Sequence, residues 1–421
     1  MAAVGGSGVC VRRLGGTRAG EIRLTRFLRN PAVRVEEMLE TARSRLAAAL
    51  PGRHVLAIQD TTVTRSEGGG GSYLHAMVAV DAADGGLLGL VDAQFLQRQG
   101  GLRRSQPQRA CADKESGRWL AGAQRAAAVC AGAAAVTVVA DREADVFECF
   151  ADRPAGAEIL IRAAHDRSLG DGGRLFAAAD AWPRAGWAAL DLAAVPGRPA
   201  RSARLAVRFG AVRLKHPRNG PRRGPAELPL TLVDLREAAP PPGVVALHWR
   251  LLTTHEVATT ADALAIAALY RRRWVIEQVF RTMKRKGFDI EALRITAEAP
   301  RNRLILATLV AAVTVMQMVG ARDGAGAAGP GGAPALRPLT DAFDPEDGPI
   351  LAALSAELEG RTARQKNPHP PGSLAFAAWV CARLGGWTGY YGKPGPIVIL
   401  NGWLDFQSIK RGSQLAQQRN V

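Results

Sequence analysis

Two short apolar segments, HVLAIQ at residues 54–59 and AVTVVA at residues 135–140, each run directly into an aspartate. Apolar runs of this length, bounded by polar residues, predict buried strands. EILIRA at 158–163 is a third run of this kind, and HWRLLTT at 248–254 is a fourth. Because segments with helical periodicity separate several of these runs, the sequence predicts an α/β fold.

The segment between the third and fourth strands has a different texture. Short strand-like pieces alternate with breaks rich in Pro and Gly, such as PRNGPRRGP and APPPG. This pattern predicts a β-rich insertion held together by turns. Helical periodicity precedes the core at residues 31–50 and follows the fourth strand near 260–286 and 301–319.

These patterns divide the chain into six parts, one of them a linker rich in Gly, Pro and Ala. The parts are a helical N-terminal segment (1–50), the first part of the α/β core (51–163), the β-rich insertion (164–248), the second part of the core (249–320), the linker (321–342), and a helical C-terminal domain that could form dimers (343–421).

The charge of the chain predicts the class of its partner. Lys and Arg number 55 against 38 Asp and Glu, which gives a formal charge of +17. An excess of this size favours nucleic acid first and an anionic membrane surface second. The longest apolar run, residues 304–319, is shorter than the roughly 20 residues that a membrane span needs, so it is expected to be a buried core helix.

Cysteine usage and the remaining motifs narrow the chemistry. The five cysteines are scattered, and the sequence contains no CxxC and no HExxH. We therefore expect neither a zinc site nor a disulfide framework, and a reducing, cytoplasmic location. The stretch GGGGS at 68–72 lacks the Gly-Lys-Ser/Thr of a phosphate loop, so no nucleotide cofactor is expected.

The segment YRRRWVIEQVFRTMK places Tyr270, Arg273, Glu277 and Lys284 along one stripe of a single predicted helix. A structural interpretation is available, in which Glu277 pairs with Arg273 and Arg281 one turn away. Each such exposed pair contributes about 0.3–0.5 kcal/mol. A cationic stripe of this kind could instead hold DNA phosphates, Arg273 by bidentate contact and Lys284 as a point charge.

Two aspartates elsewhere in the sequence, Asp60 and Asp141, could act together with Glu277. Asp60 and Asp141 follow short apolar strands, where an open α/β sheet presents functional groups. Asp60 could instead form an Asx turn with Thr61 or Thr62, and Asp141 could be a helix N-cap. Three carboxylates would suit a pair of Mg²⁺ ions. Two such ions about 4 Å apart can activate a water or a 3′-hydroxyl and stabilise the leaving oxygen of a phosphodiester.

The spacing Tyr-x2-Arg-x3-Glu-x6-Lys resembles the signature of bacterial DDE transposases of insertion sequence family four. IQDTT (58–62) is similar to the first aspartate motif of that family, and ADREAD (140–145) to the second. Further similarity covers RFLRNPAV (26–33), DKESGRWLAGA (113–123) and FAAWVCARLGGW (376–387). The resemblance extends from about residue 20 over most of the chain.

The resemblance implies a ribonuclease H-like core in which Asp60, Asp141 and Glu277 bind two Mg²⁺ ions, with Mn²⁺ as a substitute. It implies cleavage of element ends, a hairpin intermediate and strand transfer into target DNA. The implied partners are double-stranded DNA of the element ends and the target, and a second copy of the chain in the DNA complex. The implied location is the nucleoid in the cytoplasm.

Two further residues match positions of the family that meet DNA. Trp249 matches the residue that stacks on a base flipped out near the hairpin, where an aromatic ring offsets unstacking by about 1–3 kcal/mol. The alternative for Trp249 is an ordinary core position in its strand. Arg162 matches a position that faces the DNA.

One departure from the family supports an alternative function. Family members carry a longer helical domain before the RFLRNP segment, and here that space is short and rich in Gly. The alternative is an N-terminally truncated, non-transposing regulatory protein that pairs with a full-length transposase and inhibits it. A third hypothesis is a basic nucleic-acid-binding protein whose carboxylates are structural.

Overall fold

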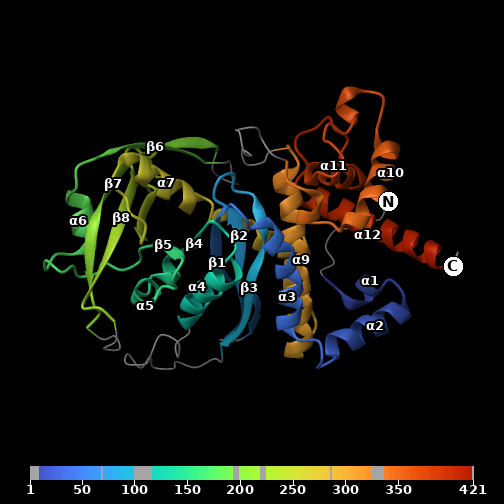
Figure 1. The fold of residues 1–421 in the computed structure, drawn as a ribbon, viewed down its shortest axis with the longest axis horizontal. Coiled ribbons are helices and arrows are strands. Elements are labelled where there is room, and N and C mark those ends of the chain that lie inside the picture. The colour runs from blue at the N-terminus through green and yellow to red at the C-terminus, as the bar shows by residue number, and fades with distance from the viewer. Residues whose placement is uncertain are drawn as a thin grey trace. The chain divides into compact units, whose positions relative to one another are not determined.

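The computed structural model describes residues 9–67, 70–98, 116–192, 199–218, 224–284, 287–324 and 336–419. The chain forms two compact units. The first unit comprises Met1–Arg53, Thr61–Gly100 and Val275–Val421, and the second comprises His54–Asp60 and Gly101–Trp274. Figure 1 labels their helices and strands.

The second unit is built on a mixed sheet, which confirms the predicted α/β class. Strands β1, β4 and β5 are parallel, and the other four strands pair antiparallel. In spatial order the strands are β1 (His54–Glu67), β4 (Ala135–Ala140), β5 (Ala157–Arg162), β9 (His248–Thr253), β8 (Glu227–Glu237), β7 (Arg201–Lys215) and β6 (Gly186–Leu192).

The parallel strands are buried because their sequences are continuous apolar runs. Helix α4 (Gly117–Val129) packs against β4 and α5 (Phe147–Ala151). Segment 164–248 contributes the antiparallel strands β6, β7 and β8. Figure 1 shows α6 (Leu175–Ala181) beside β7, and α7 (Thr260–Arg271) also packs against β7 and β8.

The first unit is mainly helical and is organised around α9 (Glu298–Ala321). This helix contacts α2, α3, β3, α11 and α12. The other elements are α1 (Val11–Gly15), α2 (Arg18–Arg29), α3 (Val35–Ala49), the hairpin of β2 (Gly70–Asp81) and β3 (Leu87–Arg98), α8 (Trp274–Met283), α10 (Gly348–Leu358), α11 (Leu374–Leu384) and α12 (Pro396–Arg419).

Helix α9 contains the longest apolar run of the sequence. By length and composition alone α9 could cross a membrane, but 67% of its most apolar window is buried inside the protein. Two arginines in its first turns are buried as well. Arg303 donates to the carbonyls of Leu28 and Val33, and Arg301 donates to the Ser72 hydroxyl at 2.9 Å. These contacts are those of a core helix.

The structure corrects two expectations about local elements. Strand β1 continues past Asp60 to Glu67, because TTVT is rich in β-branched residues, so Asp60 forms no Asx turn. The single helix predicted from Tyr270 onward is two helices. The backbone N–H of Arg272 is shared between Leu269 and Tyr270 carbonyls, which tightens the last turn of α7 and ends it before α8 begins.

Half of the predicted linker at 321–342 lies outside the described residues, since residues 325–335 are not among them. Helix α9 ends at Ala321, and a short 3₁₀ helix occupies Leu339–Asp341 on the far side.

Candidate active site

Asp60 and Asp141 lie side by side on neighbouring parallel strands of the second unit. The register of β1 and β4 pairs Ile58 with Val139. The same offset, continued two residues further, places Asp60 beside Asp141. Neighbouring strands are about 4.8 Å apart, so the two carboxyl groups occupy the same small region at one end of the parallel strands.

Arg273 joins the two aspartates. Its Nη1 donates to Asp60 Oδ2 at 3.2 Å, and its Nη2 lies 3.9 Å from Asp141 Oδ2. The Arg273 side chain is 11% exposed, whereas Asp60 and Asp141 are 22% and 35% exposed. Two carboxylates this close repel each other unless a cation lies between them, and the guanidinium is that cation in this structure.

Tyr270 fixes the orientation of Asp141 from a second direction. Its hydroxyl donates to Asp141 Oδ1 at 3.2 Å. Burial, and then the charge of Asp141, raise the pKa of the Tyr270 phenol, so this group stays a protonated donor. We refer to Asp60, Asp141, Tyr270 and Arg273 as the carboxylate site.

Trp249 and Arg162 border the carboxylate site. The ring of Trp249 meets that of Tyr270 edge to face, with centroids 5.5 Å apart. Arg162 donates to the carbonyl of His248 at 2.8 Å, and burial lowers the pKa of its guanidinium. The structure therefore brings five of the predicted residues together with Asp60: Asp141, Tyr270, Arg273, Trp249 and Arg162.

Asp141 also has the structural role that the sequence offered as an alternative. Its Oδ1 accepts from the backbone N–H of Arg142 at 2.7 Å, which makes Asp141 the N-cap of the 3₁₀ helix Arg142–Ala144. Its Oδ2 is the atom that faces Arg273. The cap fixes the side chain and leaves one oxygen directed toward the site, so the two roles are compatible.

Two residues that support the site, Asp145 and Gln59, were not predicted from the sequence. Asp145 has a fully buried side chain, which accepts from the backbone of Ala164 and His165 at 2.7 and 2.9 Å and pairs with Arg167 at 2.7 Å. It ties the turn after Asp141 to the segment after β5. Asp145 lies inside the motif ADREAD (140–145), and Gln59 lies inside IQDTT (58–62).

Gln59 connects β1 to the helix that covers it. Its side-chain amide donates to the carbonyl of Trp119 at 3.2 Å, and both groups are buried. This bond fixes α4 against the strand that carries Asp60. The available sequence signal was a Gln at the end of an apolar run, directly before the candidate ligand Asp60.

Glu277 and Lys284 belong to the first unit. Glu277 is half-buried in the first turn of α8, three residues beyond the end of the second unit. Lys284 follows α8, and its Nζ lies 3.3 Å from Glu291 Oε1. The charge of Lys284 is thus met within its own unit, and its contact with phosphate stays a prediction.

The donor set can be tested against a divalent metal. Across the described ranges, no group of three His, Cys, Asp or Glu side chains could hold a metal ion as they stand. Asp60 and Asp141 nevertheless offer hard oxygen donors side by side, the type that Mg²⁺ prefers. They fit as two of the three predicted ligands, and Arg273 supplies the neutralising charge in this structure.

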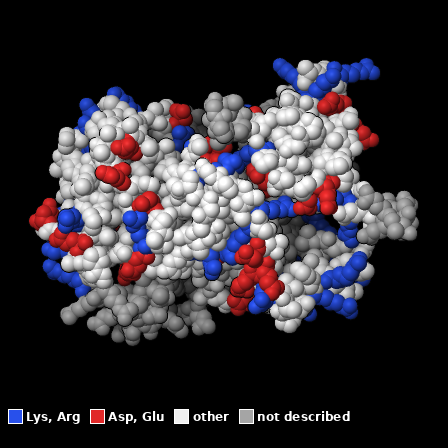
Figure 2. Space-filling model, viewed as in Figure 1, with Lys and Arg blue, Asp and Glu red and all other residues white. Residues whose placement is uncertain are grey.

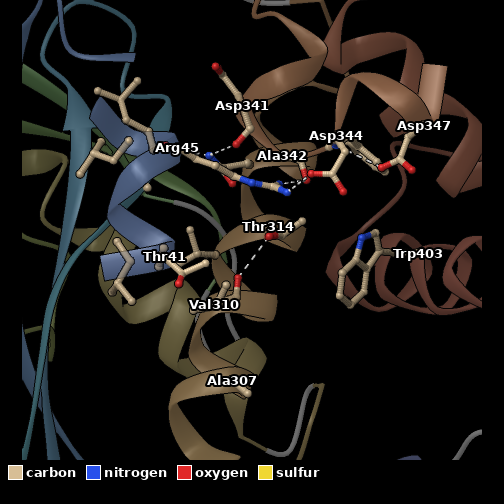
Figure 3. Close-up of a pocket in the computed structure, with 18 of the residues that line it drawn as sticks. Thr41, Arg45, Ala307, Val310, Thr314, Asp341, Ala342, Asp344, Asp347 and Trp403 are labelled. Atoms are coloured by element: carbon tan, nitrogen blue, oxygen red, sulfur yellow. Dashed lines mark hydrogen bonds and ion pairs between the residues drawn. The ribbon is translucent and has the colours of Figure 1, made fainter. Parts of the chain in front are cut away.

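A cavity of about 490 Å³ lies elsewhere, within the first unit, and contains none of the predicted site residues. Figure 3 shows Arg45 of α3 reaching toward Ala342 and Asp344, with Trp403 of α12 lining another side. Lys410 Nζ lies 3.1 Å from Asp344 and 2.7 Å from Asp347. Lys410 thus balances the charge of two of the acidic side chains that line the cavity.

A family model described as a transposase DDE domain matches residues 84–314, more than half of the chain. The matched segment contains Asp141, Trp249 and Glu277, and it begins after Asp60.

Proposed function

The chain belongs to the DDE transposases, and on that premise we propose that it cleaves the ends of a bacterial insertion element of family four and joins them to target DNA. The observation that carries this proposal is the carboxylate pair of Asp60 and Asp141 on neighbouring strands, with one guanidinium across both. Parallel strands β1, β4 and β5, with the β2–β3 hairpin following β1 in the chain, support a ribonuclease H-like core.

We assign Asp60, Asp141 and Glu277 as ligands of divalent metal, two Mg²⁺ ions or Mn²⁺ in their place. The bound ions would activate the attacking oxygen and stabilise the leaving oxygen of the phosphodiester. The carboxylates also keep the metal charge beside the scissile phosphate. Tyr270 restrains Asp141 through its hydroxyl, so that one Asp141 oxygen stays available to the metal.

Arg273 has two successive partners in this proposal. Without metal, its guanidinium neutralises Asp60 and Asp141. If these carboxylates held divalent metal, the Arg273 guanidinium would be free to bind a DNA phosphate, for which its planar fork is well suited. Metal binding and phosphate binding are thereby coupled through one side chain.

Trp249 is assigned to stack on a base displaced from the duplex. Its edge-to-face contact with Tyr270 and the bond from Arg162 to the preceding carbonyl, that of His248, hold its ring in a defined orientation. Arg162 is then a positioning residue for Trp249. The pairing of two copies on DNA and a location at the nucleoid complete the proposal.

The test is cleavage of DNA carrying the terminal sequences that flank the gene, in Mg²⁺ and in Mn²⁺. Asp60→Ala, Asp141→Ala and Glu277→Ala should each lower the cleavage rate by more than about 100-fold, since each removes charge stabilisation from the transition state. Asp191→Ala, which removes an exposed acid on β6, is the matched control. Cleavage at the parent rate by any one of the three variants would remove that residue from the site.

A further inference from the structure

One face of the antiparallel part of the second unit carries aligned cationic and aromatic side chains. The register places Trp187 of β6 opposite Ala206 of β7, Ala206 opposite Arg236 of β8, and Arg236 opposite His248 of β9. Directly paired residues project from the same face of a sheet. Arg204, two residues before Ala206, projects from that face as well.

A tryptophan organises the arginines on this face. The guanidinium carbon of Arg204 lies 3.8 Å from the centroid of the Trp187 ring, and that of Arg184 lies 4.5 Å from it. Both arginines are exposed, and Trp187 is half-buried. Contact with the ring restrains two long side chains that would otherwise be mobile, which reduces the entropy lost when they bind a ligand.

We call Arg184, Trp187, Arg204 and Arg236 the arginine–tryptophan face. None of its three arginines forms an ion pair with a residue that the structure describes, and Arg236 is exposed like the other two. Three positive charges therefore reach solvent within a small area. Because two guanidinium groups already contact the Trp187 ring, the groups left free beside that ring are cationic, which suits phosphates rather than unstacked bases. Asp191 of β6 is exposed on the same face, four residues beyond Trp187.

The other end of the same face is closed, which gives an internal contrast. There Arg208 and Arg250 lie 3.8 and 3.4 Å from the buried carboxylate of Asp234. The α6 region covers them: Arg208 donates to the carbonyl of Trp182 at 3.0 Å, and Arg250 lies over the ring of Phe176. Arginines at that end are structural, whereas those of the arginine–tryptophan face are not engaged in this way.

The arginine–tryptophan face is separate from the carboxylate site. Along β9, His248 projects toward Asp234 at 2.6 Å, and the next residue, Trp249, projects from the opposite face, where it meets Tyr270. The two surfaces thus lie on opposite faces of one sheet in one unit.

We propose that the arginine–tryptophan face binds the phosphate backbone of a duplex DNA segment other than the one held at the carboxylate site. This proposal rests on the DNA-acting function proposed above.

The experiment measures the Kd of the full chain for a short random-sequence DNA duplex. Fluorescence anisotropy, in EDTA and over a series of KCl concentrations, gives the Kd. Arg204→Ala/Arg236→Ala should weaken binding and reduce the slope of log Kd against log salt by about 2, one for each lost phosphate contact. The lysine pair, Arg204→Lys/Arg236→Lys, keeps both charges and should retain the parent slope.

The matched control removes two exposed cations from the opposite face of β7. Arg213→Ala/Lys215→Ala lowers the net charge equally and should leave the slope unchanged. The proposal is overturned if the face variant keeps the parent slope, or if the control lowers it as much. It is overturned too if the parent binds a single strand more tightly than the duplex. Since no metal is present, failure here is distinct from failure of the cleavage test.

Discussion

At the scale of single residues, Arg273 makes a contact that the sequence did not predict. The sequence predicted a phosphate contact on a helical stripe, and the structure places the guanidinium between Asp60 and Asp141. The difference has a physical cause. Two neighbouring carboxylates need a counter-charge, and the Arg273 guanidinium provides it.

Arg273→Ala should therefore have opposite effects on metal binding and on catalysis. Removal of the competing cation should tighten binding of Mn²⁺ to Asp60 and Asp141 by roughly three- to tenfold, a modest gain because solvent reaches the site. Cleavage should fall by about 100-fold or more, since a phosphate contact is lost. Mn²⁺ titration followed by electron paramagnetic resonance, at pH 8, measures the first effect.

Arg271→Ala is the control for this experiment, because Arg271 is an exposed arginine at the end of α7. It removes the same charge two residues away and should leave Mn²⁺ affinity close to that of the parent. Weaker Mn²⁺ binding by Arg273→Ala than by the parent would show that Arg273 organises the carboxylates instead of competing for them.

At the scale of helices and strands, apolar runs predicted where the buried strands lie, but they did not predict where every strand and helix ends. Strands β4 and β5 lie at Ala135–Ala140 and Ala157–Arg162, within a residue of the expected positions, because each is a short run of buried apolar residues. The extension of β1 had a signal in the sequence, the β-branched residues of TTVT. The break after α7 had none, since it coincides with contacts from Arg273 to aspartates far away in the sequence.

The candidate site divides in the same way. That Asp60 and Asp141 are candidates for one site was predictable, because each directly follows a short apolar run and an open α/β sheet presents functional groups at such positions. The bond from Tyr270 to Asp141 and the buried anchor Asp145 depend on tertiary packing, which one sequence does not encode as a visible pattern. The placement of Glu277 among the ligands remains a prediction.

One half-buried histidine, His255, should make the second unit sensitive to acid. Thr137 Oγ1 of β4 lies 2.8 Å from Nε2 of His54 and 2.9 Å from Nε2 of His255. Burial lowers the pKa of His255, so the unfolded chain binds its proton more readily than the folded one. This contribution to stability is full above the ordinary His pKa of about 6.5 and is lost as pH falls through that value toward the lower folded pKa.

Urea unfolding at pH 7.5 and pH 5.0 measures this effect. His255→Gln removes the titrating group, so its free energy of unfolding should fall less between the two pH values than that of the parent. The charged neighbours Glu158 and Arg153 pair with each other at 2.8 Å and are present in both proteins, so the difference isolates His255. Equal losses in the two proteins would contradict the expectation.

The crossing of α11 and α12 should depend on a glycine. A Cβ built on Gly402 would lie 1.7 Å from the carbonyl oxygen of Cys381, so the two helix backbones touch at this point. Gly402→Ala should force them apart and lower the free energy of unfolding by about 1–3 kcal/mol. Thermal unfolding followed by circular dichroism measures the change.

Gly412 provides the control on the same helix, because a Cβ built there meets nothing within 4 Å. Gly412→Ala should leave stability unchanged or raise it by up to about 1 kcal/mol, the difference in helix propensity. Equal behaviour of the two variants would mean that α11 and α12 do not cross as closely as described.

At the scale of the whole molecule, the formal charge of +17 overstates what is available to a polyanion. Some arginines are buried and structural: Arg303 binds backbone carbonyls, and Arg337 lies 2.9 Å from Asp84. Figure 2 shows basic and acidic side chains intermixed over the visible face instead of separated into a basic half. Local groups such as the arginine–tryptophan face, more than net charge, should then determine non-specific binding.

This distribution of charge predicts how strongly DNA binding by the parent protein depends on salt. Each phosphate contact contributes about 0.9 to the slope of log Kd against log salt, so the three open arginines account for about 3. Allowing for a few further contacts, the slope for a random duplex should lie at roughly 3 to 6. If most of the net charge contacted phosphates, the slope would be about 15. A measured slope above about 10 would show that the cations act together as one broad surface, and that the pairing seen in the structure gives way when DNA binds.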